Sequence, residues 1–201
     1  MQSIFLALLI VLVVSYSPLT TAQEYDDERE WDYLEDSGKG PEHWGDLNEN
    51  WTICKTGVWQ SPIDLWDRWA DVVRHLGRLQ TTYKPANATL LNRGHDIMLK
   101  WVDDAGSLQI EGTNYALKQC HWHSPSEHHI NGFGVDLEVH MVHQSSDEKI
   151  AVVGILYRIN FGDDPFLVKH ARCNARPIQP LNGREVLLNV LGHHPTILQS
   201  I

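Results

Sequence analysis

Residues 119–123 read QCHWH and residues 138–140 read EVH, and both stretches lie in alternating segments typical of β-strands. Side chains two positions apart on a strand share one face of the sheet. His121 and His123 therefore point the same way, and His140 is in phase on the next strand. Three neutral imidazoles held by a rigid sheet make a tetrahedral zinc site with one position open to solvent. A structural zinc usually has four protein ligands, so the pattern predicts a zinc site of the catalytic kind.

Two polar residues share the strand faces of these histidines. A metal-binding histidine needs a hydrogen-bond partner on its second ring nitrogen, which fixes the tautomer and the ring orientation. Gln119 and Glu138 are in phase with the histidines and are predicted to supply those partners. The nearby His128, His129 and His143 fall outside the pattern and are interpreted as ordinary histidines of the fold.

Short strands separated by turn residues surround the two stretches. They are predicted over residues 89–92, 97–102, 108–110, 115–122, 136–144 and 150–159. The last of these is an almost unbroken apolar run, as expected of a strand covered on both faces. Residues 66–76 are predicted to form a short helix, and the chain after residue 166 has no clean period. The pattern indicates a mostly β domain with few short helices.

The chain ends and the net charge narrow the class of protein. The formal charge of −10 argues against a nucleic acid or an anionic membrane surface as partner. A continuous apolar run near the N-terminus, followed by small residues, predicts a secretory signal peptide over residues 1–22. No other apolar stretch is long enough for a stable membrane span. Residues 23–40 are predicted to be an acidic arm, disordered or loosely attached, and residues 41–201 to be the domain.

Modification sites fit the secretory route. Asn50 and Asn87 begin the sequons NWT and NAT and are predicted glycosylation sites. Cys54 and Cys173 are candidates for a disulfide, although a sequence does not give the distance between them. Cys120 faces away from the predicted metal and is interpreted as a small buried hydrophobe. The extracellular space or apoplast, or a plastid reached by the secretory route, are all compatible destinations.

Five motifs in order resemble the alpha-class carbonic anhydrases, with wording similar to secreted plant-type members. They are QSPID at 60–64, NRGH at 92–95, QCHWHSPSEH at 119–128, EVHMVH at 138–143 and NARPIQP at 174–180. The resemblance implies a single domain built on a large twisted central β-sheet, a Zn²⁺ cofactor, and reversible hydration of carbon dioxide to bicarbonate and a proton. It also implies that the three in-phase histidines bind the zinc, supported by the glutamine and the glutamate.

The resemblance assigns roles to four further residues. His95 would carry the proton between the zinc site and solvent, which suits a side chain whose pKa lies near neutral. Glu127 would orient the attacking oxygen through a threonine hydroxyl. Val142 and Val152 would form the apolar wall beside which carbon dioxide sits.

The chain departs from the family between Phe166 and Asn174. The family has a longer segment there, with a Ser-Leu-Thr-Thr-Pro-Pro-Cys motif and an apolar strand, and neither has a counterpart here. The domain is therefore expected to be incomplete. Glu127 is expected to lack its threonine partner, which would lower activity, and Cys54 to lack its family partner. The strand at 150–159 is expected to expose an unprotected edge.

Two other functions remain open at this point. A non-catalytic relative would keep the fold, with or without the metal, as a storage or binding protein; the missing threonine favours it, and the complete histidine set favours the enzyme. The spacing of His121, His123 and Glu127, followed by Gly134, also resembles half of the cupin metal motif, which would imply a jelly roll with iron or manganese. The second half of that motif is absent from the sequence.

Overall fold

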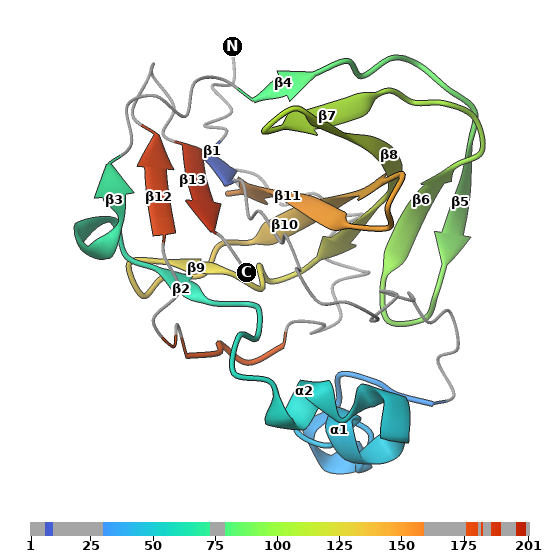
Figure 1. The fold of residues 1–201 in the computed structure, drawn as a ribbon. Coiled ribbons are helices and arrows are strands. Elements are labelled where there is room, and N and C mark those ends of the chain that lie inside the picture. Colours follow the sequence, from blue (N-terminus) through green and yellow to red (C-terminus); the bar gives the residue numbers. More distant parts are fainter. Residues whose placement is uncertain are drawn as a thin grey trace.

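The computed structural model describes residues 7–9, 30–72, 79–158, 176–180, 182, 186–189 and 196–199. Within these ranges the chain is mostly β, as predicted, and its helices are single turns. The main element is an 11-stranded, twisted sheet (Figure 1). Among the described residues, no helix combines the length and the apolar character needed to cross a bilayer.

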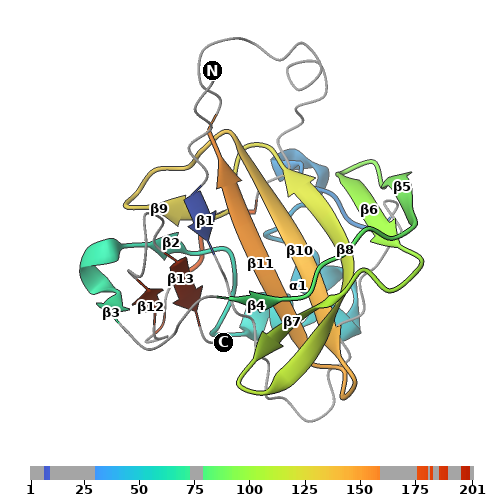
Figure 2. The same ribbon diagram turned by 90° about the horizontal axis from the view of Figure 1, so that it is seen from above.

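Three long antiparallel strands form the centre of the sheet. They are β8 (Thr113–His123), β10 (Leu137–Ser145) and β11 (Ile150–Tyr157), which lie side by side in Figure 2. Their apolar and β-branched residues suit a pleated, buried surface. Gly112, at φ +81°, forms the turn before β8, and Glu148, at φ 63°, lies in the tight turn between β10 and β11. The predicted strands at 115–122, 136–144 and 150–159 are confirmed with small shifts of their ends.

Shorter strands extend the sheet beyond β8. One pair is β6 (Ile97–Trp101) with β5 (Ala88–Asn92), and the other is β7 (Ser107–Ile110) with β4 (Gln80–Thr81). Both β6 and β7 pair with β8, along different halves of that long strand. These elements confirm the predicted strands at 89–92, 97–102 and 108–110.

The far edge of β11 is paired, which corrects the expectation of an exposed edge at 150–159. Residues Gly154–Leu156 pair antiparallel with β1 (Ala7–Leu9), which in turn pairs with β13 (Thr196–Gln199). The sheet continues through β12 (Val186–Asn189) to β3 (Asp71–Val72). Strand β1 belongs to the segment predicted as a signal peptide; the rest of residues 1–22 lies outside the described residues.

Single-turn helices join the N-terminal part to the sheet. They are η1 (Glu35–Ser37), α1 (Trp44–Leu47), η2 (Glu49–Trp51) and α2 (Ile53–Thr56). Residues 30–40 of the predicted arm make defined contacts: the Trp44 indole N–H donates to the carbonyl of Asp32 at 3.0 Å, and Trp31 and Tyr33 pack edge-on against Trp44. Residues 23–29 of the arm lie outside the described residues.

The predicted helix at 66–76 is wrong over its described part. The chain instead forms a 3₁₀ turn, η3 (Asp67–Trp69), followed by strand β3. Just before it, β2 (Asp64–Leu65) pairs in parallel with β9 (His129–Ile130) in a separate two-stranded sheet. Pairing with these distant segments outweighs the weak local helical preference of the stretch.

A hydrophobic core packs against one face of the central strands. Leu108, Tyr115, Ala151 and Val153 are at most 3 % exposed and pack with the partly buried Met141. Burial of each large apolar side chain of this kind contributes roughly 1.5–3 kcal/mol. Since Met141 directly follows His140 on β10, this core lies on the face opposite the histidine ring. The packed face holds the strands rigid while the other face is left for the site.

Candidate metal centre

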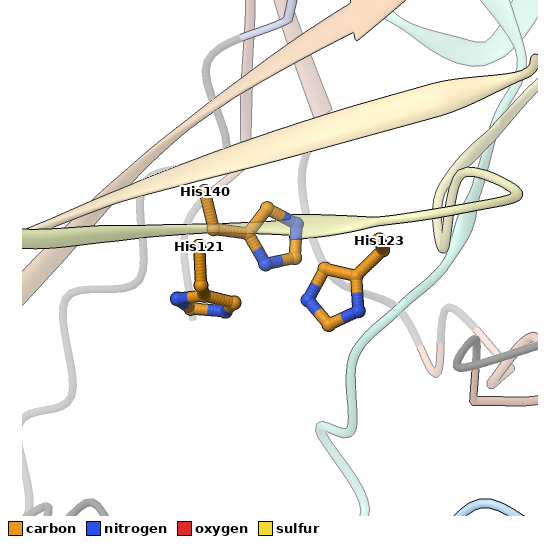
Figure 3. Close-up of side chains that lie close together, drawn as sticks. All are labelled: His121, His123 and His140. Atoms are coloured by element: carbon orange, nitrogen blue, oxygen red, sulfur yellow. The ribbon is translucent and has the colours of Figure 1, made fainter. Parts of the chain in front are cut away.

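The register of β8 against β10 brings the three predicted ligands together. His140 lies directly opposite His121, and His123 lies opposite Glu138. Figure 3 shows the three rings grouped on one side of the strands. Their ring centroids are 4.7 to 5.3 Å apart, and one ring nitrogen from each lies within 4.8 Å of the other two. The predicted grouping on one face is therefore what the structure has.

Two hydrogen bonds fix the orientation of the rings. Nδ1 of His121 donates to Oε1 of Gln119 at 2.9 Å, since an amide oxygen only accepts. Nε2 of His140 donates to Oε1 of Glu138 at 2.7 Å. These bonds leave a lone pair on Nε2 of His121 and on Nδ1 of His140. Both nitrogens are thus prepared to bind a cation, in the arrangement that Gln119 and Glu138 were predicted to impose.

The Glu138 carboxylate also holds a fourth histidine, which the sequence analysis had taken as ordinary. Glu138 is fully buried, and its Oε2 accepts from the backbone N–H of His128 at 2.8 Å. Its Oε1 accepts from Nδ1 of His128, also at 2.8 Å. Burial alone would raise the pKa of Glu138, but His128 and His140 lower it well below its ordinary value. The charged carboxylate therefore links two imidazoles, and only the tertiary structure reveals the second.

The electrostatic surroundings suit a metal cation. Burial lowers the pKa of His121 well below its ordinary value, and the neighbouring imidazoles lower it further. This keeps the ring neutral, as a metal ligand must be. Burial opposes protonation of His140 as well, yet the Glu138 and Glu127 carboxylates raise its pKa overall. Three imidazoles with two carboxylates nearby form a donor set that fits Zn²⁺ in charge and ligand type.

Glu127 lies at the centre of this group. Its Oε2 is 3.5 Å from Nε2 of His123 and 3.9 Å from Nδ1 of His140. Its Oε1 accepts from the backbone N–H of Arg176 at 3.0 Å. The expectation that Glu127 lacks a partner is therefore wrong: a backbone amide supplies one, while residues 166–174 lie outside the described residues.

Arg176 is held in place by the first conserved-looking loop of the chain's own motif at 60–64. Its guanidinium donates to Oε1 of Gln60 at 2.9 Å and to the carbonyl of Ser61 at 2.8 Å. It also donates to the carbonyl of Cys54 at 3.2 Å and lies over the ring of Trp44. These contacts explain how a residue far along the chain reaches Glu127, a link that spacing along the sequence does not reveal.

His95 lies under the aromatic side chains of the N-terminal part. Its ring centroid is 4.1 Å from that of Trp31 and 6.0 Å from that of Tyr33, and its side chain is 7 % exposed. Burial lowers the pKa of His95, and the nearby Asp96 carboxylate partly offsets this. Asp96 is itself paired with the buried Arg93. The predicted proton-carrying role of His95 stays a prediction.

The two predicted pocket residues are neighbours. Val142 on β10 pairs with Val152 on β11, and both are partly buried. The β8–β10 register shifts directly after Val142, an irregularity of the kind found beside functional sites. Because residues alternate along β10, Val142 shares the face of His140.

The predicted modification sites are only partly described. Asn50 and Asn87 are exposed, and the Asn87 amide donates to Asp103 at 2.6 Å. Cys54 is partly buried, whereas Cys173 lies outside the described residues, so their pairing stays a prediction. Cys120 is 6 % exposed, in keeping with its interpretation as a buried hydrophobe.

Comparison with known proteins gives a consistent family. The model of the family described as "Eukaryotic-type carbonic anhydrase" matches residues 39–165. Alpha carbonic anhydrase 7 of Arabidopsis thaliana is 51 % identical over 155 residues, which are 77 % of this chain and 56 % of that protein.

Dioscorins are also similar. Dioscorin DB3L of Dioscorea polystachya is 51 % identical over 142 residues, covering 70 % of this chain and 52 % of that protein. A crystal structure of dioscorin complexed with ascorbate superposes with a TM-score of 0.65 at 34 % identity, covering 86 % of this chain and 81 % of the other. The chain thus spans little more than half the length of these two sequence relatives.

Proposed function

Because the chain belongs to the eukaryotic-type carbonic anhydrase family, we propose that it binds one zinc ion and hydrates carbon dioxide to bicarbonate. The ligands in this proposal are His121, His123 and His140. The observation that carries it is the convergence of three ring nitrogens within 4.8 Å on one face of the sheet. When bound there, zinc would act as a Lewis acid that makes water a nucleophile near neutral pH, for which carbonic anhydrases are the standard example.

The chain's own residues prepare this site. Gln119 and Glu138 fix the tautomers of two ligands through the bonds at 2.9 and 2.7 Å. Val142 and Val152 offer an apolar surface to a non-polar substrate on the ligand side of the strands. His95 would move the proton between the site and solvent, and its lowered pKa leaves it neutral and able to accept that proton at pH 7.

We further propose that hydration is slower than in full-length relatives. The chain lacks a counterpart for the family's threonine-containing segment, and it spans 56 % of its Arabidopsis relative. Positioning of the reacting groups by preorganised hydrogen bonds carries much of an enzyme's rate enhancement. A site that keeps its metal ligands but loses a positioning hydroxyl should therefore retain activity at a reduced rate.

The test combines zinc analysis with a carbon dioxide hydration assay on the purified full chain. About one zinc per folded chain, together with hydration that disappears after chelation and returns with zinc, supports the proposal. Zinc far below one per chain in a folded sample would count against the ligand set. Hydration as fast as that of a full-length relative would refute the reduced rate alone.

A non-catalytic storage or binding role is the second candidate. The similarity to dioscorin DB3L and to the dioscorin structure favours it. A chain of this kind would keep the fold and bind zinc without hydrating carbon dioxide. Full zinc occupancy with no hydration above the buffer rate would decide for this role.

The proposed route of the protein is secretory. Residues 1–22 would direct entry, and Asn50 and Asn87, both exposed, would carry glycans. N-terminal sequencing of the protein purified from a eukaryotic host tests the cleavage. A mobility shift on glycosidase treatment tests the glycans, and loss of that shift in the double variant Asn50→Gln, Asn87→Gln identifies the sites.

A further inference from the structure

The carboxylate of Glu127 lies where a fourth metal ligand would lie. Its Oε2 is 3.5 Å from Nε2 of His123 and 3.9 Å from Nδ1 of His140, the nitrogen that the Glu138 bond leaves with a lone pair. Zinc ligands at about 2.0–2.1 Å in a tetrahedron are roughly 3.3 Å from one another. The two measured separations are therefore close to those between ligands that share one zinc ion.

The second oxygen of the carboxylate is held from behind. Oε1 accepts from the backbone N–H of Arg176 at 3.0 Å, and the Arg176 guanidinium is anchored on Gln60 and Ser61. The Glu127 side chain is only 11 % exposed. A carboxylate fixed at one oxygen and buried keeps its other oxygen directed at the histidines, so little conformational entropy remains to be lost on metal binding.

From this geometry we propose that Oε2 of Glu127 is the fourth protein ligand, so that the centre is closed as His₃Glu and does not keep the position open to solvent. The proposal rests on the zinc site of the proposed function and specifies its state. A centre with four protein ligands is of the structural kind. Competition between Glu127 and solvent for the fourth position would then be a cause of slow hydration.

Cobalt substitution tests the closure directly, because the visible absorption of Co²⁺ reports its ligands. The full chain is freed of metal with a chelator and loaded with one equivalent of Co²⁺, and spectra are recorded from pH 6 to 9 with and without azide. A closed centre gives bands that change neither with pH nor with azide. In Glu127→Gln the bands should respond to both, and zinc affinity measured by chelator competition should fall at least 10–100-fold, the loss typical for a supporting residue.

Two further variants separate ligation from charge. Glu127→Asp keeps the negative charge but shortens the side chain by one methylene; it should open the centre as Glu127→Gln does, and it carries the test if the glutamine variant does not fold. Asp136→Asn removes an exposed carboxylate before β10 and should leave the spectra unchanged. Far-ultraviolet circular dichroism checks the fold of each variant.

The outcomes separate the two proposals. Bands in the wild-type chain that respond to azide and pH would overturn the role of Glu127 and leave the hydration proposal standing. An aspartate variant with wild-type spectra would also overturn it, since charge alone would then suffice. A folded chain that takes up no Co²⁺ would overturn the metal centre and the role of Glu127 together.

Discussion

The two sides of β11 are built differently. On one side β10 and β8 are 9 and 11 residues long and pair in a continuous antiparallel register that carries the histidines. On the other side, β1, β13, β12 and β3 are only 2 to 4 residues long and come from both ends of the chain. The site depends only on contacts of the first side. Changes there should affect zinc binding, whereas changes on the second side should affect assembly.

The largest expected effect is loss of a ligand on the first side. His123→Ala removes a ring that is 3 % exposed and contributes one of the three grouped nitrogens. Two remaining imidazoles do not hold zinc tightly, so zinc affinity should fall by more than the 10–100-fold typical of a supporting residue. Chelator competition measures this, with His43→Ala as the exposed-histidine control. Zinc affinity equal to that of the control would break the assignment of the site to β8 and β10.

Glu138→Gln should have the next largest effect. The amide keeps the shape of the carboxylate, but it cannot accept from both His128 and His140 as the charged group does. Loss of the His140 orientation should lower zinc affinity about 10–100-fold. Because a buried charged pair is broken, the free energy of unfolding should also fall by roughly 3–5 kcal/mol. Urea unfolding of the metal-free chain gives the second number, and unchanged values in both measurements would show that Glu138 does not orient the site.

The first side was predictable because its information is local. Alternation along β8 and β10 shows which residues share a face, and the in-phase Gln119 and Glu138 followed from it. The strands of the second side were not predicted, because segments of 2 to 4 residues are too short to show a period. Their pairing partners, such as β1 and β13, are far apart in the chain.

Within the site, the residues that were missed lie on loops. His128 precedes β9 and has no phase relation to Glu138, yet the connection folds back and buries it against that carboxylate. The Arg176 amide reaches Glu127 from 49 positions away. The resemblance identified Glu127 as a functional position but predicted the wrong partner, since only the folded chain shows which groups surround it.

A smaller effect is expected from His143, on the core face of the first side. Tyr83 donates its hydroxyl to Nε2 of His143 at 2.8 Å, and Nδ1 of His143 donates to the carbonyl of Ala151 at 3.1 Å. Burial lowers the pKa of His143 to about 4. The unfolded chain, with an ordinary pKa near 6.5, therefore binds a proton that the folded chain does not, and stability falls as the pH drops from about 6.5 towards 4.

This contribution can be removed by one substitution. His143→Gln keeps a donor for Ala151 and an acceptor for Tyr83 but does not titrate. Between pH 7 and pH 5, the wild-type chain should lose on the order of 2 kcal/mol more stability than the variant. Urea unfolding at the two pH values measures the difference, with His43→Gln as the exposed control. Equal losses in the wild type and His143→Gln would mean that His143 titrates normally, whereas zinc affinity should stay unchanged in both variants.

Deletion of residues 1–22 tests the second side and should have the smallest effect on the metal site. It removes β1, so that Gly154–Leu156 of β11 lose their edge partner. An unpaired edge of an apolar strand favours pairing with another chain, and the deletion variant should self-associate as its concentration rises. Analytical ultracentrifugation detects this, and zinc affinity should stay that of the full chain.

A point substitution tests the same edge without shortening the chain. Leu8→Pro removes one backbone N–H from the strand that faces Ile155 and is poorly tolerated within a ladder. It should shift the chain towards self-association in the same direction as the deletion, but less. A deletion variant that stays monomeric would mean that β1 does not protect β11. If the deletion instead abolished zinc binding while β8 and β10 remained folded, the two sides of β11 would be coupled, and the independence of the site from the chain ends would be wrong.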